Sequence, residues 1–136
     1  MQGAAPVPDA DLARQRAVVD AFFAAARAGD FAALLGVLDP EVVVRADAGA
    51  VPLGAPRVVR GAAAVAEQVL ATGGFARFAQ MARPVLVNGA AGVVIAAGGR
   101  PFAVVGFTIR GGKVVAIDIL ADPARLRQLD LAALDH

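Results

Sequence analysis

The chain has 136 residues, of which 58% are hydrophobic and 18% are charged, and its formal net charge is +1 at pH 7. This length suits one domain with a sizeable core, and the apolar content excludes a disordered chain. We therefore predict a linker or frayed start over residues 1–8 and a single domain over residues 9–136. The nearly balanced charge offers no broad attraction for nucleic acid, so no direct nucleic-acid binding is expected.

Cysteine is absent, and the only histidine, His136, is the last residue. These counts disfavour disulfides, thiolate ligands and a zinc centre, and we expect neither a metal nor another cofactor. The sequence has no apolar run of about 20 uncharged residues that would span a bilayer. The first residues also lack the basic and then apolar segments of a signal peptide. We predict a cytoplasmic protein that does not associate with membranes.

Two helices are predicted near the start of the chain. From Asp9 onward, apolar residues recur at helical spacing, which predicts a long amphipathic helix that ends at Gly29. Asp30 can cap a second, shorter helix, which Asp39 and Pro40 should stop. The two helices should therefore meet at a tight corner.

The first strand is predicted over Glu41–Asp47. Successive side chains of a strand point to opposite faces, so Val43, Arg45 and Asp47 should share one face. A short helix is expected later, over Ala62–Ala71. This order places one strand between helices, before the rest of the sheet.

A four-stranded meander is predicted between Gln80 and Leu120. Its first two strands are Gln80–Val87 and Ala91–Ala97, and its last two are the arms of Arg100–Leu120, with Gly111 and Gly112 at the turn. The final hairpin is apolar on both faces, so both faces should be covered. Because helices can cover only one of them, we expect the isolated domain to be a homodimer.

A final helix is predicted after the meander. Asp122 can act as its N-cap, Pro123 suits its first turn, and Leu126 and Leu129 lie along it. The whole order of elements predicts an α+β fold, in which a curved antiparallel sheet wraps around the N-terminal helices as a cone with an open mouth.

The chain resembles the SnoaL-like branch of the nuclear transport factor 2-like superfamily. The resemblance is carried by the corner at Gly29 and Asp30, by the segment FAALLGVLDPEVVVRAD after it, and by the hairpin GGKVVAIDIL. It implies the cone-shaped, cystatin-like or nuclear transport factor 2-like barrel of that superfamily, with a hydrophobic pocket.

Two further segments, Arg45–Ala50 and Asp122–Leu126, resemble the C-terminal extension of a group of extracytoplasmic-function sigma factors. In that group the first place is typically glycine-rich and ends in a basic residue, and the second begins with Asn-Pro. Here alanines replace glycines, and Asp122 replaces the asparagine. The resemblance implies a non-catalytic regulatory and ligand-sensing domain, which contacts sigma regions or RNA polymerase and takes a small apolar ligand.

The segment after the hairpin is the candidate for partner docking. A capped helix that begins there would hold Asp122 and leave Arg125 and Leu126 to contact the sigma regions. Leu126 can instead pack on the sheet of the domain itself.

Asp118 is a carboxylate between two isoleucines, Ile117 and Ile119. SnoaL-like cyclases and ketosteroid-isomerase relatives use a pocket carboxylate as a base, so the alternative function is a small isomerase, cyclase or hydrolase with Asp118 as general base. Asp118 can also be an outward surface charge. The sequence has no tyrosine or tryptophan to stabilise a developing enolate, which disfavours catalysis.

Four residues are candidates for the ligand pocket: Arg45, Asp47, Gln80 and Phe22. Arg45 and Asp47 would line the mouth of the cone, and Gln80 would orient a ligand. The alternatives are an exposed ion pair for Arg45 and Asp47 and a structural core position for Phe22.

Overall fold

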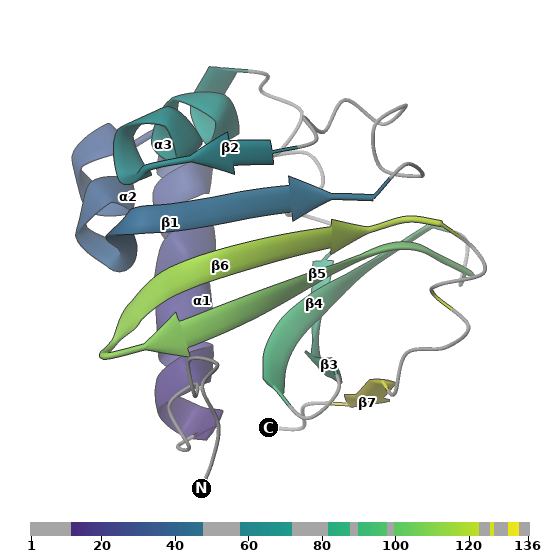
Figure 1. The fold of residues 1–136 in the computed structure, drawn as a ribbon. Helices are drawn as coiled ribbons and strands as arrows, with labels where there is room; N and C mark the ends of the chain where they lie inside the picture. The colour runs from purple at the N-terminus through teal and green to yellow at the C-terminus, as the bar shows by residue number, and fades with distance from the viewer. Residues whose placement is uncertain are drawn as a thin grey trace, which may run out of the picture.

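The computed structural model describes residues 12–47, 58–71, 82–87, 90–97, 100–122, 126 and 131–133 (Figure 1). The three helices are α1 (Leu12–Ala28), α2 (Phe31–Val37) and α3 (Ala62–Ala71). The strands are β1 (Leu38–Ala46), β2 (Val58–Arg60), β3 (Ala82–Val87), β4 (Ala90–Ala97), β5 (Arg100–Arg110), β6 (Lys113–Leu120) and β7 (Leu131–Ala133). No helix within these ranges is long and apolar enough to cross a bilayer.

The corner between α1 and α2 is formed by Gly29 and Asp30. Gly29 has a φ of 68°, a left-handed conformation that glycine adopts without a steric penalty. The Asp30 side chain accepts a hydrogen bond of 3.0 Å from the backbone N–H of Ala33 and so caps α2. The corner and cap predicted from the sequence are confirmed.

Strand β1 begins at Leu38, directly after α2 and before the predicted start at Glu41. Leu38 is 1% exposed and pairs with Val114 of β6. The strand therefore starts earlier than predicted because Leu38 is buried beside β6. The register shifts between Leu38 and Val43, and Pro40 lies within this irregular part, where its missing N–H removes no ladder bond. The proline therefore stops the helix without preventing the strand.

The sheet has the strand order β2-β1-β6-β5-β4-β3-β7. Strands β3, β4, β5 and β6 are successive antiparallel neighbours, which confirms the predicted meander. Strand β1 pairs with β6 in parallel, so the sheet is mixed and the expectation of an antiparallel sheet throughout is corrected. The reason is topological: the chain leaves β1, passes through α3 and the meander, and returns beside β1 with the same direction. In the described strands the sheet stays open, with β2 and β7 at its two edges.

The hairpin of β5 and β6 turns at two glycines. Gly111 and Gly112 have φ values of 62° and 76°, and Arg110 pairs with Lys113 across the turn. Two successive positive φ values define the tight hairpin turn that Gly-Gly predicts. Lys113 then donates a 2.7 Å hydrogen bond from Nζ to the carbonyl of Gly36 in α2, which ties the turn to the helical layer.

The predicted final helix lies mostly outside the described residues, and Leu126, which is described, is helical. The N–H of Leu126 donates to the carbonyl of Asp122 at 2.9 Å, which is one helical turn. Strand β7 follows and pairs antiparallel with β3, with Leu131 opposite Val87. Leu129 lies outside the described residues, and β7 was not predicted from the sequence.

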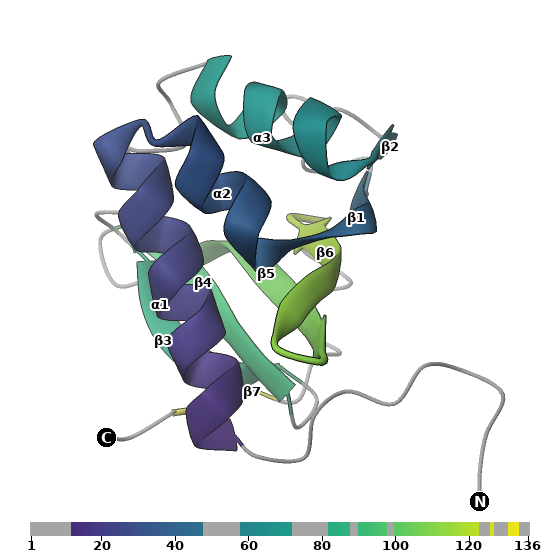
Figure 2. The same ribbon diagram turned by 90° about the vertical axis from the view of Figure 1, so that its left-hand side faces the viewer.

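The core lies between the sheet and the three helices, which all cover the same face of the sheet (Figure 2). Phe22 of α1, Leu34 of α2 and Val65 of α3 are fully buried against the sheet. The Phe22 ring makes edge contacts with those of Phe23 and Phe107, at centroid distances of 5.5 and 5.4 Å. Helices and sheet are therefore joined by a packed hydrocarbon core.

Gln15 is the buried polar residue of the described core, with an exposed fraction of 3%. Its side-chain Oε1 accepts a 2.9 Å hydrogen bond from the backbone N–H of Ala91 at the start of β4. A buried amide needs such a partner because desolvation is otherwise uncompensated. Gln15 thereby fixes the position of α1 along β4.

The face of the sheet away from the helices is also partly apolar. Val105 and Phe107 of β5 belong to the core, so by alternation Val104, Gly106 and Thr108 point to the opposite face. Val104 is nevertheless 0% exposed. The homodimer expected from this second apolar face stays a prediction.

Candidate functional site

Charged side chains gather where β1 and β6 end side by side. The parallel register places Arg45 opposite Asp118. Arg45 Nε donates to Asp118 Oδ1 at 2.9 Å, and Arg45 Nη2 donates to Oδ2 at 3.2 Å. Val44 and Ala46 beside Arg45 are buried in the core, so this bidentate pair lies on the face away from the helices. The side chains are 58% and 36% exposed, which makes it a surface ion pair.

Asp47, the next residue after β1, connects the same two strand ends. Its carboxylate accepts hydrogen bonds of 3.1 Å from the backbone N–H groups of Ala121 and Asp122. Its own backbone N–H donates to the carbonyl of Ile119 at 3.0 Å. Asp47 therefore holds the chain at the point where it leaves β6 and enters the turn that contains Leu126.

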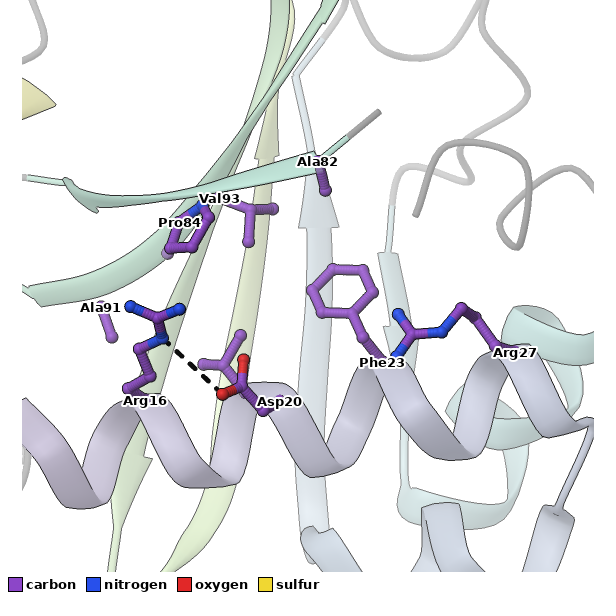
Figure 3. A pocket seen from close by; sticks show the side chains of 10 residues that line it. Arg16, Asp20, Phe23, Arg27, Ala82, Pro84, Ala91 and Val93 are labelled. Carbon is purple, nitrogen blue, oxygen red and sulfur yellow. Dashed lines mark ion pairs between the residues drawn. The ribbon is translucent and has the colours of Figure 1, made fainter. Parts of the chain in front are cut away.

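A pocket lies elsewhere, between α1 and strands β3 and β4, and Figure 3 shows it. Its volume is about 100 Å³. Three charged residues of α1 line it, namely Arg16, Asp20 and Arg27, and Phe23 stands between Asp20 and Arg27 on the same helix. Arg16 Nε lies 3.6 Å from Asp20 Oδ2. The opposite wall is apolar.

Metal-binding chemistry finds no support in the part of the chain that the structure describes. No group of three or more histidine, cysteine, aspartate or glutamate side chains lies close enough there to hold an ion.

Comparison with solved structures identifies the fold of the chain. An NTF2-like protein from Burkholderia xenovorans LB400 matches with a TM-score of 0.54 and 22% identity, over 88% of this chain and 98% of that protein. A de novo designed protein with a curved β-sheet matches with a TM-score of 0.56 and 16% identity, over 87% of this chain and 93% of the design. The chain has the nuclear transport factor 2-like fold. The predicted α+β cone is confirmed.

A third match adds sequence similarity to this fold. The crystal structure of the Mycobacterium tuberculosis extracytoplasmic function sigma factor SigJ matches with a TM-score of 0.68 and 28% identity, over 83% of this chain. The predicted resemblance to sigma factors of this class is confirmed. The match covers 44% of SigJ, so the chain spans less than half the length of that sigma factor. No family model and no curated protein matches the chain.

The nuclear transport factor 2-like fold brings some predicted site residues together and separates others. Arg45, Asp47, Asp118, Asp122 and Leu126 come from the adjoining ends of β1 and β6 and the turn after them. Their meeting requires the parallel pairing of β1 with β6, which brings together residues far apart in the sequence.

Phe22 does not share a pocket with Arg45, although both were candidates for one. Phe22 is 0% exposed in the core under the helices, whereas Arg45 points to the opposite face of the sheet. Alternation along β1 separates them. Gln80 and Arg125 lie outside the described residues, and their roles stay predictions.

The pocket residues Arg16, Asp20 and Arg27 were not predicted as site residues. The sequence carries a signal for them, because Arg16, Asp20, Phe23 and Arg27 recur at spacings of four, three and four residues, which places them on one face of a helix. That signal gives the helix face but not the strands opposite it.

The exposure of the Arg45–Asp118 pair predicts a small role in stability. Asp118→Asn should lower the free energy of unfolding by about 0 to 1 kcal/mol, because exposed ion pairs gain little over hydration. Urea unfolding followed by circular dichroism measures it, and a double-mutant cycle with Arg45→Met gives the coupling. A loss above about 2 kcal/mol would show that the pair acts as a buried one.

Proposed function

We propose that this chain is a non-catalytic regulatory and ligand-sensing domain of an extracytoplasmic-function sigma factor. It would act in the cytoplasm by contacting sigma regions or RNA polymerase. The observation that carries the proposal is the match to SigJ, which has the highest TM-score of the structures described above and 28% identity. The match involves 44% of SigJ, as expected for one domain of a longer protein.

The geometry at the ends of β1 and β6 supports a docking role for the segment from Asp122 to Leu126. The Asp47 carboxylate accepts from the N–H groups of Ala121 and Asp122, so the segment leaves the sheet from a fixed point. A partner surface that is held in place loses less conformational entropy on binding.

The position of Asp118 supports a non-catalytic function. A general base for proton abstraction needs a free carboxylate in a site that excludes water. Both oxygens of Asp118 are instead engaged by Arg45, on the exposed face of the sheet. Ketosteroid or polyketide turnover that Asp118→Asn abolishes would favour the alternative, a small isomerase, cyclase or hydrolase.

Transcription in vitro tests the regulatory role. The chain is assayed in the full sigma factor if its reading frame contains sigma regions, or is otherwise added to separate sigma regions and polymerase. Arg125→Glu should change promoter-specific transcript yield several-fold while shifting the stability of the domain by under about 0.5 kcal/mol.

The matched control is Arg110→Glu, which reverses an exposed charge at the β5–β6 turn. It should leave the transcript yield unchanged. If both variants behave like the wild type while the protein stays folded, the docking role fails. If transcription is also unaffected by removal or addition of the whole domain, the regulatory function fails as well.

A further inference from the structure

The pocket between α1 and the strands β3 and β4 is separate from the partner surface. The ten described residues that line it come from α1, β3 and β4. The proposed docking segment lies at the ends of β1 and β6, and β5 separates β6 from β4 in the sheet. The pocket can therefore be occupied without covering the docking segment.

The walls of the pocket are mainly hydrocarbon. Phe23 rises from α1 toward Ala82 of β3, and Pro84 of β3 and Val93 of β4 face the helix across the pocket (Figure 3). Phe23 and Val93 also belong to the hydrophobic core, with exposed fractions of 7% and 4%. Their positions are thus fixed by packing, and the apolar surface is preformed.

The charges at the rim do not cancel. Asp20 lies beside Arg16, with 3.6 Å between Arg16 Nε and Asp20 Oδ2, so Arg16 offsets its negative charge. Arg27 also lines the pocket, from the last turn of α1. Among the residues that the structure describes, no acidic side chain pairs with Arg27. Of the described residues at the rim, two are arginines and one is an aspartate, which is one positive charge in excess.

We infer that this pocket binds a small organic monocarboxylate with an apolar body. Arg27 binds the carboxylate, because a guanidinium matches its two oxygens. Phe23, Pro84 and Val93 contact the body. A volume of about 100 Å³ is well above the roughly 10–15 Å³ that one water needs, so the pocket has room for a small organic group.

This inference rests on the ligand-sensing part of the proposed function and names the chemical class of the ligand. It departs from the small apolar ligand expected from the sequence in one respect, the negative charge. A neutral molecule of the same shape would make the same apolar contacts and leave Arg27 without its counter-charge. Affinity should therefore depend on the carboxylate as well as on the ring.

Benzoate is the probe, and benzamide is its neutral counterpart of similar shape. Titration of the whole chain, followed by methyl NMR, should show saturable shifts at Val19 and Val93, which line the pocket, and none at Val43 on the opposite face. Ligands of this size commonly bind with dissociation constants of roughly millimolar. Benzamide should bind at least about tenfold more weakly, because it cannot form the charge-assisted contact with Arg27.

Two variants assign the anion contact. Arg27→Gln should weaken benzoate binding at least about tenfold and leave benzamide binding unchanged. Arg83→Gln is the matched control, because Arg83 is exposed on β3 between Ala82 and Pro84 and points by alternation to the other face. It removes the same charge without removing a lining residue, so it should not alter binding.

Three results would overturn the inference: shifts that do not saturate, equal binding of benzoate and benzamide, or equal losses in the two arginine variants. The last would indicate attraction by net charge alone. The titration uses no polymerase or promoter. A failure here would thus leave the transcriptional role standing, and a failure in transcription would leave this binding result standing.

Discussion

Replacing Phe22 with alanine should lower the free energy of unfolding by about 3–5 kcal/mol. Phe22 is 0% exposed, and its ring contacts those of Phe23 and Phe107 edge-on at 5.5 and 5.4 Å. The substitution removes apolar burial, the ring contacts with Phe23 and Phe107, and the side chain that fills the space between α1 and β5. Because the sequence has no tryptophan or tyrosine, urea unfolding should be followed by far-ultraviolet circular dichroism.

Phe31→Ala is the matched control for this prediction. Phe31 begins α2 and is 38% exposed, so the same substitution should cost less than about 1 kcal/mol there. Equal losses in the two variants would contradict the packing described for α1. A loss below about 1.5 kcal/mol at Phe22 would show that its surroundings are open, as expected if it lined a ligand cavity.

Local structure in this chain is predictable because short-range chemistry determines it. Gly29 supplies the positive φ at the corner, and Asp30 supplies the helix cap. Gly111 and Gly112 supply the positive φ values of the hairpin turn. Each of these features depends on residues within one turn of each other, so the sequence pattern is enough.

The order of strands is less predictable because long-range pairing determines it. The parallel pairing of β1 with β6 places Arg45 beside Asp118. No local sequence signal indicates that β1 pairs with β6 and not with the other outer strand of the meander. Strand β7 is short, and its residues Leu131–Ala133 also suit a helix. Its pairing with β3 overrides that propensity.

The candidate site also has features that the local sequence predicts and features that depend on long-range pairing. Alternation along β1 predicts that Arg45 and Asp47 share a face, but the direction of that face depends on where the helices pack. The two faces available to Asp118 could be distinguished only once its pairing with Arg45 and the burial of Ile117 were known. The pocket at Arg27 needed the opposing strands as well as the helix face.

Strands β4 and β5 approach each other closely at the paired glycines Gly92 and Gly106. A Cβ atom on Gly92 would lie 2.7 Å from the backbone oxygen of Val105 and 2.7 Å from Cγ2 of Val87. The Val87 side chain can rotate, but the carbonyl of Val105 can move only with its strand. Glycine at position 92 therefore permits the spacing of the two strands.

Gly92→Ala should accordingly lower the free energy of unfolding by about 1–3 kcal/mol, the usual cost of overpacking. Gly106→Ala is the matched control, because its Cβ would meet nothing closer than Cγ1 of Val87 at 3.8 Å. That change should stay within about 0.5 kcal/mol or stabilise slightly, since alanine loses less backbone entropy on folding. Adding Val87→Ala to Gly92→Ala should not restore stability, because the contact with the Val105 carbonyl remains. If the double variant recovers the wild-type urea midpoint after correction for Val87→Ala alone, the side chain of Val87 and not the strand spacing requires glycine here.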